Sequence, residues 1–266
     1  MKRRSASSPP PSSIYTKEYF LSEACEGFDA YKEGKLSTVR RRELDLLESH
    51  PGMVVLDVGC GRGDLADELV RRGVSVVAVD YAVAAVQLTA DRLARRAPVV
   101  HADAARLPFR DAVFDRVLLG DVIEHLVWPS AVAALAESRR VIREPGFLLV
   151  HTAPNRWFAD GVLRFLRPLL PLLGWRAAIE RLSRYDDLRV DMHPNELSPL
   201  GLRRLVREAG LSGRVWIDRD VLRGGESEWA RDIQGSPFWR GIASLAGNWP
   251  FRLVFGNDLY ARVSRQ

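Results

Sequence analysis

The chain has 266 residues, which is long enough for one α/β domain with a substantial core. A hydrophobic fraction of 47% and a charged fraction of 27% are typical of globular proteins, and they argue against wholesale disorder and against a membrane-spanning architecture. The net charge of +5 comes from short arginine groups spread along the chain, not from one basic stripe, so nucleic acid is disfavoured as a partner.

The N-terminal residues and the cysteines indicate the cellular context. Residues 1–13 are rich in Ser and Pro and contain no apolar segment of the secretory type, so they are predicted to form a disordered tail. Cys25 and Cys60 are far apart in the sequence, which argues against a disulfide framework and a cysteine-based zinc site. We therefore expect a cytoplasmic protein, and the sequence predicts no metal site.

The order of apolar runs predicts the fold. Residues 14–50 form a helical, aromatic-rich segment, and residues 51–266 then form the main domain. In the main domain, short apolar runs alternate with amphipathic segments, which predicts a doubly wound Rossmann-like α/β sheet of about seven, mostly parallel strands. We expect the last strand to run antiparallel. The first five strands are predicted at Met53–Val58, Ser75–Asp80, Pro98–Ala102, Phe114–Leu119 and Phe147–Thr152, with helices at Asp64–Arg72, Ala82–Arg96 and Pro129–Ile142.

The regular alternation ends after Thr152. Two insertions are predicted, a helical one at 155–191 following the fifth strand and an irregular one at 219–249. Between them lie a helix at Pro199–Ala209, which Gly210 is expected to end, and a strand at Gly213–Asp218. The last strand is expected within Phe251–Arg265.

A glycine-rich loop follows the first strand directly. Gly59, Gly61 and Gly63 alternate with Cys60 and Arg62, and Asp64 stands where a dinucleotide fingerprint requires its third glycine. A nicotinamide cofactor is therefore disfavoured. The loop also lacks the Lys-Ser or Lys-Thr pair of a phosphate-binding P-loop.

Acidic residues end the second and third predicted strands. Asp80 lies about 20 residues beyond the glycine loop, where α/β cofactor domains place a carboxylate for ribose hydroxyls. Asp103 follows the third strand and could accept a hydrogen bond from an adenine amino group. The structural alternatives are a helix cap for Asp80 and a turn for Asp103.

Together these motifs resemble the class I S-adenosylmethionine-dependent methyltransferases, in particular the type 11 branch that includes the ubiquinone biosynthesis O-methyltransferases. The resemblance is strong over about residues 54–152 and resumes faintly near Ser198–Leu211. The resemblance rests on the glycine loop, on Asp57 and Asp80, and on these further motifs: Ala102-Asp103-Ala104, Leu107-Pro108-Phe109, Phe114-Asp115-Arg116-Val117, Asp121-Val122-Ile123-Glu124-His125-Leu126 and Arg143-Glu144-Pro145-Gly146.

The resemblance implies S-adenosylmethionine as the cofactor and assigns roles to individual residues. The three loop glycines would flank its methionine part, and Asp57 would orient the loop. Asp80, with the adjoining Tyr81, would hold the ribose. The remaining predicted cofactor-site residues are Asp103 and Ala104, which would contact adenine, and Asp121, which would line the pocket between cofactor and acceptor.

Histidine and aromatic side chains suggest further roles. His125 is the candidate general base for a hydroxyl acceptor, and the alternative is that Glu124 and His125 fix the loop by hydrogen bonding. His151 is interpreted as a packing or cap residue. Tyr15 and Tyr19 could face the sulfonium cation of the cofactor, or they could simply pack a helical flap.

The acceptor is expected to be a small or lipid-like molecule methylated on oxygen, and less readily on nitrogen or carbon. The apolar segment 157–182 is interpreted as a cover over the acceptor pocket or as a peripheral membrane contact. Two rival functions stay open: a non-catalytic S-adenosylmethionine-binding protein and a nucleic-acid methyltransferase.

Overall fold

The computed structural model describes residues 10–162, 192–218, 253 and 256–265. The predicted insertion at 219–249 and most of the insertion at 155–191 lie outside these residues. So does most of the predicted N-terminal tail, although Ser12–Ile14 forms a short 3-10 turn, η1.

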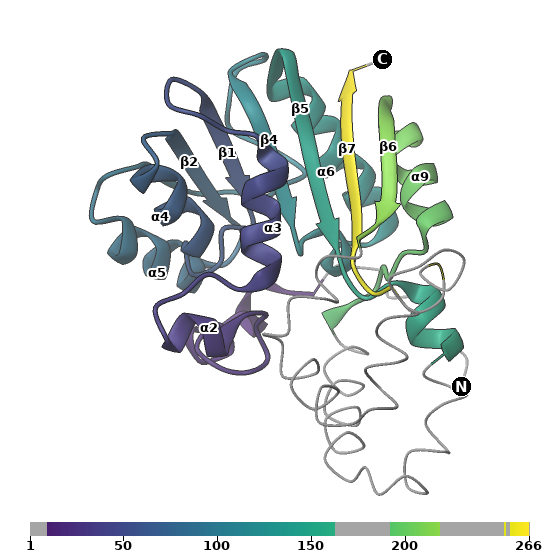
Figure 1. Cartoon of the computed structure of the whole chain (residues 1–266), viewed down its shortest axis with the longest axis horizontal. Helices are drawn as coiled ribbons and strands as arrows, with labels where there is room; N and C mark the ends of the chain where they lie inside the picture. Colours follow the sequence, from purple (N-terminus) through teal and green to yellow (C-terminus); the bar gives the residue numbers. More distant parts are fainter. Residues whose placement is uncertain (1–9, 163–191, 219–252, 254–255, 266) are drawn as a thin grey trace, which may run out of the picture.

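The core of the protein is one seven-stranded sheet with the order β3-β2-β1-β4-β5-β7-β6 (Figure 1). The first five strands run parallel, and β7 runs antiparallel to both of its neighbours, as predicted. The strands are β1 (Val54–Val58), β2 (Ser75–Asp80), β3 (Val99–His101), β4 (Phe114–Gly120), β5 (Ile142–Thr152), β6 (Leu211–Ile217) and β7 (Leu259–Arg265).

The largest error in a predicted boundary is at the start of β5. Strand β5 begins at Ile142, five residues before the predicted start at Phe147, because Ile142 already pairs with Phe114. The register then shifts, and Phe147 pairs with Arg116. The intervening Arg-Glu-Pro-Gly sequence is typical of a turn, yet it forms an irregularity within a continuing strand.

Helices cover both faces of the sheet, as expected for a doubly wound fold. Leu56 and Val55 are neighbours on β1 that point into different cores, since side chains alternate along a strand. Gly210, with φ of +68°, donates its amide to the Arg207 carbonyl oxygen and ends the helix Pro199–Glu208 as predicted. The helices of the Val55 face are α3 (Thr38–Leu47), α4 (Asp64–Arg71) and α5 (Val83–Leu93), and those of the Leu56 face are α6 (Trp128–Val141) and α9 (Pro199–Glu208).

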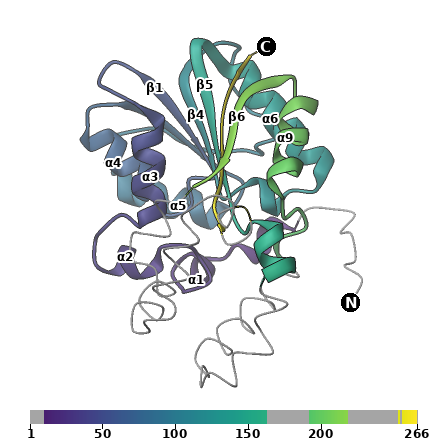
Figure 2. The same ribbon diagram turned by 45° about the vertical axis from the view of Figure 1, so that its right-hand side comes forward.

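The N-terminal segment is helical only in short pieces. After η1 come α1 (Lys17–Phe20) and α2 (Phe28–Lys32), and the chain then enters α3. Gly27 interrupts the helical pattern with φ of +72°, and a Cβ there would lie 2.7 Å from the Ser37 Cβ. This tight turn brings α1 and α2 beneath the carboxyl ends of the parallel strands (Figure 2).

Among the described residues, none of the helices has the length and apolar character needed to cross a bilayer.

Candidate active site

The glycine loop bends sharply at the end of β1. Gly59, Gly61 and Gly63 all have positive φ, at +80°, +55° and +75°. A Cβ on Gly59 would lie 2.3 Å from the Val122 Cγ2, so the loop packs directly against the turn that follows β4. The predicted loop thus requires glycine both for its backbone conformation and for close packing.

Asp80 lies beneath this loop at the end of β2. Its side chain is 9% exposed and accepts hydrogen bonds from the amides of Gly61 at 2.9 Å and Ala82 at 2.8 Å. Burial raises the pKa of Asp80, and the backbone hydrogen bonds oppose that rise. One carboxylate therefore fixes the glycine loop and the turn that precedes α5 together. The predicted helix cap is not formed, because the N-cap residue of α5 is Ala82 and no side chain caps this helix.

The other predicted cofactor residues lie along the same edge of the sheet, because the carboxyl ends of parallel strands meet there. Tyr81 is 46% exposed next to Asp80, and its carbonyl oxygen lies 3.0 Å from the His101 Nε2. Asp103 is exposed and accepts a hydrogen bond from the Ala105 amide at 2.8 Å, while Ala104 is buried. The turn predicted as the alternative for Asp103 is thus present.

Asp57 is the buried acid of β1. Its side chain is 4% exposed, and burial raises its pKa to about 7, with the positive charge of Arg40 opposing the rise. Asp57 precedes the glycine loop by one residue at the end of β1, and its role in orienting the loop stays a prediction.

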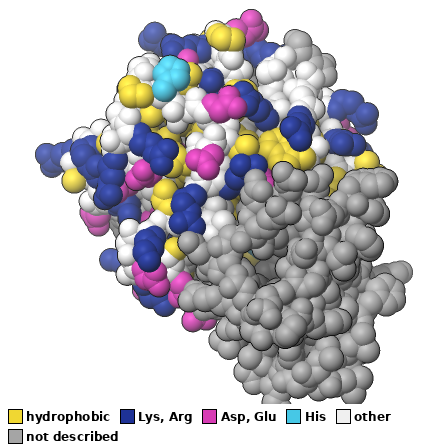
Figure 3. Space-filling view, in the orientation of Figure 1, with side chains coloured by type: hydrophobic (Ala, Val, Ile, Leu, Met, Phe, Trp, Pro, Cys, Tyr) yellow, Lys and Arg dark blue, Asp and Glu magenta, His cyan; other side chains and the backbone are white. Residues whose placement is uncertain are grey.

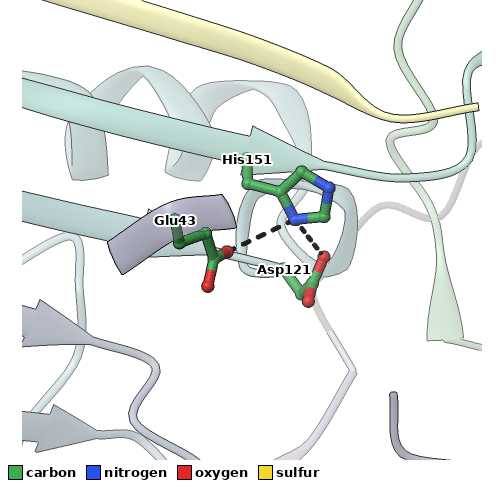
Figure 4. Close-up of side chains that lie close together, drawn as sticks. All are labelled: Glu43, Asp121 and His151. Carbon is green, nitrogen blue, oxygen red and sulfur yellow. Dashed lines mark ion pairs between the residues drawn. The ribbon is translucent and has the colours of Figure 1, made fainter. Parts of the chain in front are cut away.

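Asp121 begins the turn after β4 with φ of +56°, a strained conformation for a residue with a side chain. Arg40 Nη2 lies 3.1 Å from its Oδ2. His151 Nδ1 lies 2.8 Å from its Oδ1, a contact drawn in Figure 4. These two ion pairs lower the pKa of Asp121 against the effect of burial. Asp121 is therefore an ionised carboxylate held by residues from α3 and β5.

His125 lies four residues further along the same turn, in η2 (Ile123–His125). Its Nδ1 lies 2.9 Å from the Met192 carbonyl oxygen and 3.1 Å from the Tyr15 hydroxyl. A carbonyl oxygen only accepts, so Nδ1 carries the proton and Nε2 holds the lone pair. Burial lowers the pKa of His125, which keeps the ring neutral at pH 7.

Glu124 does fix the turn, as the alternative interpretation expected. It is 2% exposed and accepts a hydrogen bond from the Thr152 hydroxyl at 2.8 Å, and its backbone carbonyl accepts one from the Asn195 amide. Burial, with the neighbouring Asp121 charge, raises the pKa of Glu124 to about 8. Both residues of the alternative interpretation therefore make hydrogen bonds that hold the turn, and His125 in addition keeps a neutral ring nitrogen, Nε2, outside these bonds.

Arg62 ties the N-terminal segment to the glycine loop. It is 6% exposed, and its guanidinium donates to the carbonyl oxygens of Phe20 and Glu26 and to the Asp64 carboxylate. The Phe20 ring lies 3.8 Å from the Cβ position of Gly61 and packs with Ala82. The N-terminal segment is thereby held as a cap over the loop.

Sequence reasoning missed Arg62, Arg40 and Glu43 as parts of this region, and it interpreted His151 only as a packing or cap residue. Arg62 stands inside the glycine motif at a position that the motif leaves free. The other three come from α3 and β5, and only the folded chain brings them to the end of β4.

A separate hollow of about 810 Å³ lies over the half of the sheet that carries β7 and β6. Four of its charged lining residues form two ion pairs: Arg262 with Glu48 at 2.8 Å, and Arg42 with Asp218 at 2.7 Å. Basic and acidic side chains are interspersed over this face (Figure 3).

Comparison with known proteins identifies the class. Residues 56–150 match the family model described as a methyltransferase domain. Demethylmenaquinone methyltransferases of Mycobacterium tuberculosis and Mycobacterium bovis are 34% identical over 182 residues, covering 66% of this chain and 74% of the relatives. The relative from Beutenbergia cavernae is also 34% identical, over 181 residues and 72% of its length. The chain belongs to the class I S-adenosylmethionine-dependent methyltransferases, and S-adenosylmethionine is its cofactor.

Solved structures agree on the fold. A putative methyltransferase from Haloferax volcanii, solved with a methyltransferase activator, has a TM-score of 0.61 at 17% identity and covers 94% of this chain and 97% of that one. The [4+2]-cyclase SpnF has a TM-score of 0.59 at 17% identity and covers 99% of both chains. At 17% identity these similarities show the fold alone, and a cyclase is among the proteins that share it.

The contacts of Arg62 predict that it holds the N-terminal cap. In Arg62→Met, two backbone carbonyls lose a charged donor, which costs about 1–3 kcal/mol when such groups stay buried. Amides of residues 17–32 should then exchange with solvent faster, while those of β1 and β4 keep their protection. Amide hydrogen exchange measures this, with the exposed Arg71→Met as the control. Unchanged exchange at residues 17–32 would contradict the role.

Proposed function

We propose that the enzyme methylates a hydroxyl-bearing, lipid-like aromatic acceptor, with His125 as the general base. The observation that carries this proposal is the state of the His125 ring, whose Nδ1 is committed to the Met192 carbonyl and whose Nε2 is neutral and basic. A methyl transferase needs such a group only when the acceptor must lose a proton to become nucleophilic.

The acceptor class is supported by the relatives. Their name states that they act on demethylmenaquinone, and the chain is 34% identical to them. A reduced quinone of that kind carries hydroxyl groups on an aromatic ring. Removal of a hydroxyl proton produces an anion whose charge is shared between oxygen and ring carbon, so the same base serves oxygen or carbon methylation, with oxygen as our first proposal.

In the proposed reaction, His125 Nε2 accepts the hydroxyl proton as the acceptor oxygen attacks the methyl carbon. The bond between that carbon and the cofactor sulfur breaks, and its electron pair stays on sulfur to give S-adenosylhomocysteine. Positioning the acceptor in line behind the methyl group supplies much of the acceleration. In this proposal Asp121 borders the methyl-transfer position from the end of β4.

The cofactor roles proposed for the other residues follow the edge of the sheet. Gly59, Gly61 and Gly63 would leave room for the methionine part, and Asp80 with Tyr81 would hold the ribose. Asp103 and Ala104 would contact adenine. The proposed role of Asp80 is supported by the hydrogen bonds that its two carboxylate oxygens accept from backbone amides. Because these bonds already order the side chain, less conformational entropy is lost when ribose binds.

The cellular setting is proposed on the same basis. The described cysteines, Cys25 and Cys60, are both free thiols, which is compatible with a reducing cytoplasm. Segment 157–182, interpreted as a cover over the acceptor pocket or as a peripheral membrane contact, lies mostly outside the described residues; the described part, Trp157–Val162, is one π-helical turn.

Asp80→Ala should weaken S-adenosylhomocysteine binding by roughly 10-fold to 100-fold, because a hydrogen bond to a charged group contributes about 1.5–3 kcal/mol. Isothermal titration calorimetry measures the affinity. Asp91→Ala removes an exposed carboxylate from α5 and serves as the control. Wild-type affinity in Asp80→Ala would remove Asp80 from the cofactor site.

The acceptor proposal is tested by incubating the protein with methyl-labelled S-adenosylmethionine and reduced demethylmenaquinone. Labelled quinone and S-adenosylhomocysteine should form together, and nuclear magnetic resonance of the product locates the methyl group. His125→Gln should lower turnover by about 100-fold or more, the range for loss of a general base, with cofactor affinity unchanged.

The pH dependence gives an independent measurement for His125. Because its pKa in the folded protein is lowered, the basic form prevails above that pKa, so turnover falls only when the pH drops below the usual histidine value of about 6.5. In His125→Gln, turnover should no longer fall as the pH drops through this range. Full turnover in His125→Gln would refute the role as base, and cofactor binding without product from any hydroxylated acceptor would favour a non-catalytic protein.

A further inference from the structure

Three side chains from distant parts of the sequence converge beside the proposed cofactor site. Glu43 comes from α3, Asp121 from the end of β4 and His151 from β5 (Figure 4). The His151 Nδ1 lies 2.8 Å from the Asp121 Oδ1 and 3.4 Å from the Glu43 Oε1. One ligand atom from each residue lies within 4.8 Å of the other two. The two separations from His151 Nδ1, 2.8 and 3.4 Å, lie within the range for ligand atoms at about 2.0–2.2 Å from one central ion.

The two carboxylates are oriented by a single guanidinium. Arg40 binds the Glu43 Oε2 at 2.7 Å and the Asp121 Oδ2 at 3.1 Å. Each carboxylate therefore uses one oxygen on Arg40 and presents the other to His151. Glu43 is 0% exposed, and its Oε1 accepts no hydrogen bond from any described residue. A buried carboxylate oxygen that accepts no hydrogen bond lowers the stability of the folded protein unless a cation binds it.

His151 is oriented from its other side. Its ring is 1% exposed, stacks at 4.6 Å on Tyr260 and places Nε2 3.3 Å from the Asp258 Oδ1. The Nδ1 atom lies near two oxygens but has hydrogen-bond geometry with neither. Metal-binding histidines characteristically donate one ring N–H to a carboxylate and direct the other nitrogen at the ion, which is the arrangement seen here.

We propose that Glu43 Oε1, Asp121 Oδ1 and His151 Nδ1 bind one divalent transition-metal ion. One imidazole with two carboxylates suits Zn²⁺, Mn²⁺ or Fe²⁺, whereas Ca²⁺ takes oxygen ligands alone. The carboxylates of Glu43 and Asp121 share the one charge of Arg40, and a bound dication would take the place of a proton on His151 in balancing them. Asp121 is 19% exposed and provides the entry path.

The ion would connect α3 to the ends of β4 and β5. It would hold Asp121 in its left-handed conformation and so fix the turn that carries His125. This inference does not depend on the acceptor proposed above, because it concerns ion binding by residues outside the His125 contacts. The sequence predicted no metal site, since its ligands have no motif spacing.

Metal binding by the full chain tests the proposal. After treatment with a chelator, the protein is dialysed against micromolar Zn²⁺ and analysed for metal, and a Co²⁺ titration is followed by visible absorption. We expect one ion per chain. His151→Asn and Glu43→Gln should each weaken binding at least 10-fold, and Asp258→Ala, which removes the carboxylate behind His151, by about 10-fold to 100-fold. The exposed His50→Asn is the matched control.

The possible outcomes distinguish a metal ion bound to His151 from a proton bound to His151. Absence of stoichiometric Zn²⁺ or Co²⁺ binding by the wild-type protein would overturn the proposal and leave a protonated His151 between the carboxylates. Unchanged binding in folded His151→Asn, checked by circular dichroism, would overturn it as well. Should that variant fail to fold, the wild-type stoichiometry and the loss of affinity in Asp258→Ala decide the question.

Discussion

Carboxylates buried at one edge of the sheet, and their need for partners, determine how the rest of the structure is arranged. Parallel strands direct their carboxyl ends to the same side, so Asp57, Asp80 and Asp121 gather there. A buried charge is tolerated only when it is paired or hydrogen-bonded. Asp80 meets this requirement with backbone amides of the glycine loop, and Asp121 meets it with Arg40 and His151. Helix α3, which carries Arg40, is thereby fixed across the sheet.

The same requirement explains why residues preceding the first strand belong to the active-site region. Arg62 is a buried cation within the glycine loop, and the backbone carbonyls of the N-terminal segment supply its acceptors. The loop and the cap over it are thus stabilised together. Tyr15 extends this connection to His125, so the N-terminal segment contacts both the cofactor loop and the proposed base.

Prediction from sequence succeeded where the signal is local. The strands, the helices between them and the glycine loop are encoded in neighbouring residues, and the antiparallel last strand follows from the resemblance to a known class. The start of β5 was missed because Pro145 and Gly146 indicate a turn. The Glu43, Asp121 and His151 cluster could not be predicted, because each residue alone is an ordinary helix or strand residue. The acceptor also remained open, since fold alone does not determine it.

The central claim is that the carboxyl edge of the sheet, closed by the N-terminal cap, binds S-adenosylmethionine with its methyl group directed toward His125. A crystal structure of the protein with bound S-adenosylhomocysteine tests it most directly. The account predicts the ribose on Asp80, the adenine beside Asp103 and Ala104, and the sulfur next to Asp121, with Arg62 still bound to the cap. A ligand located elsewhere, or a ribose that does not contact Asp80, would contradict it.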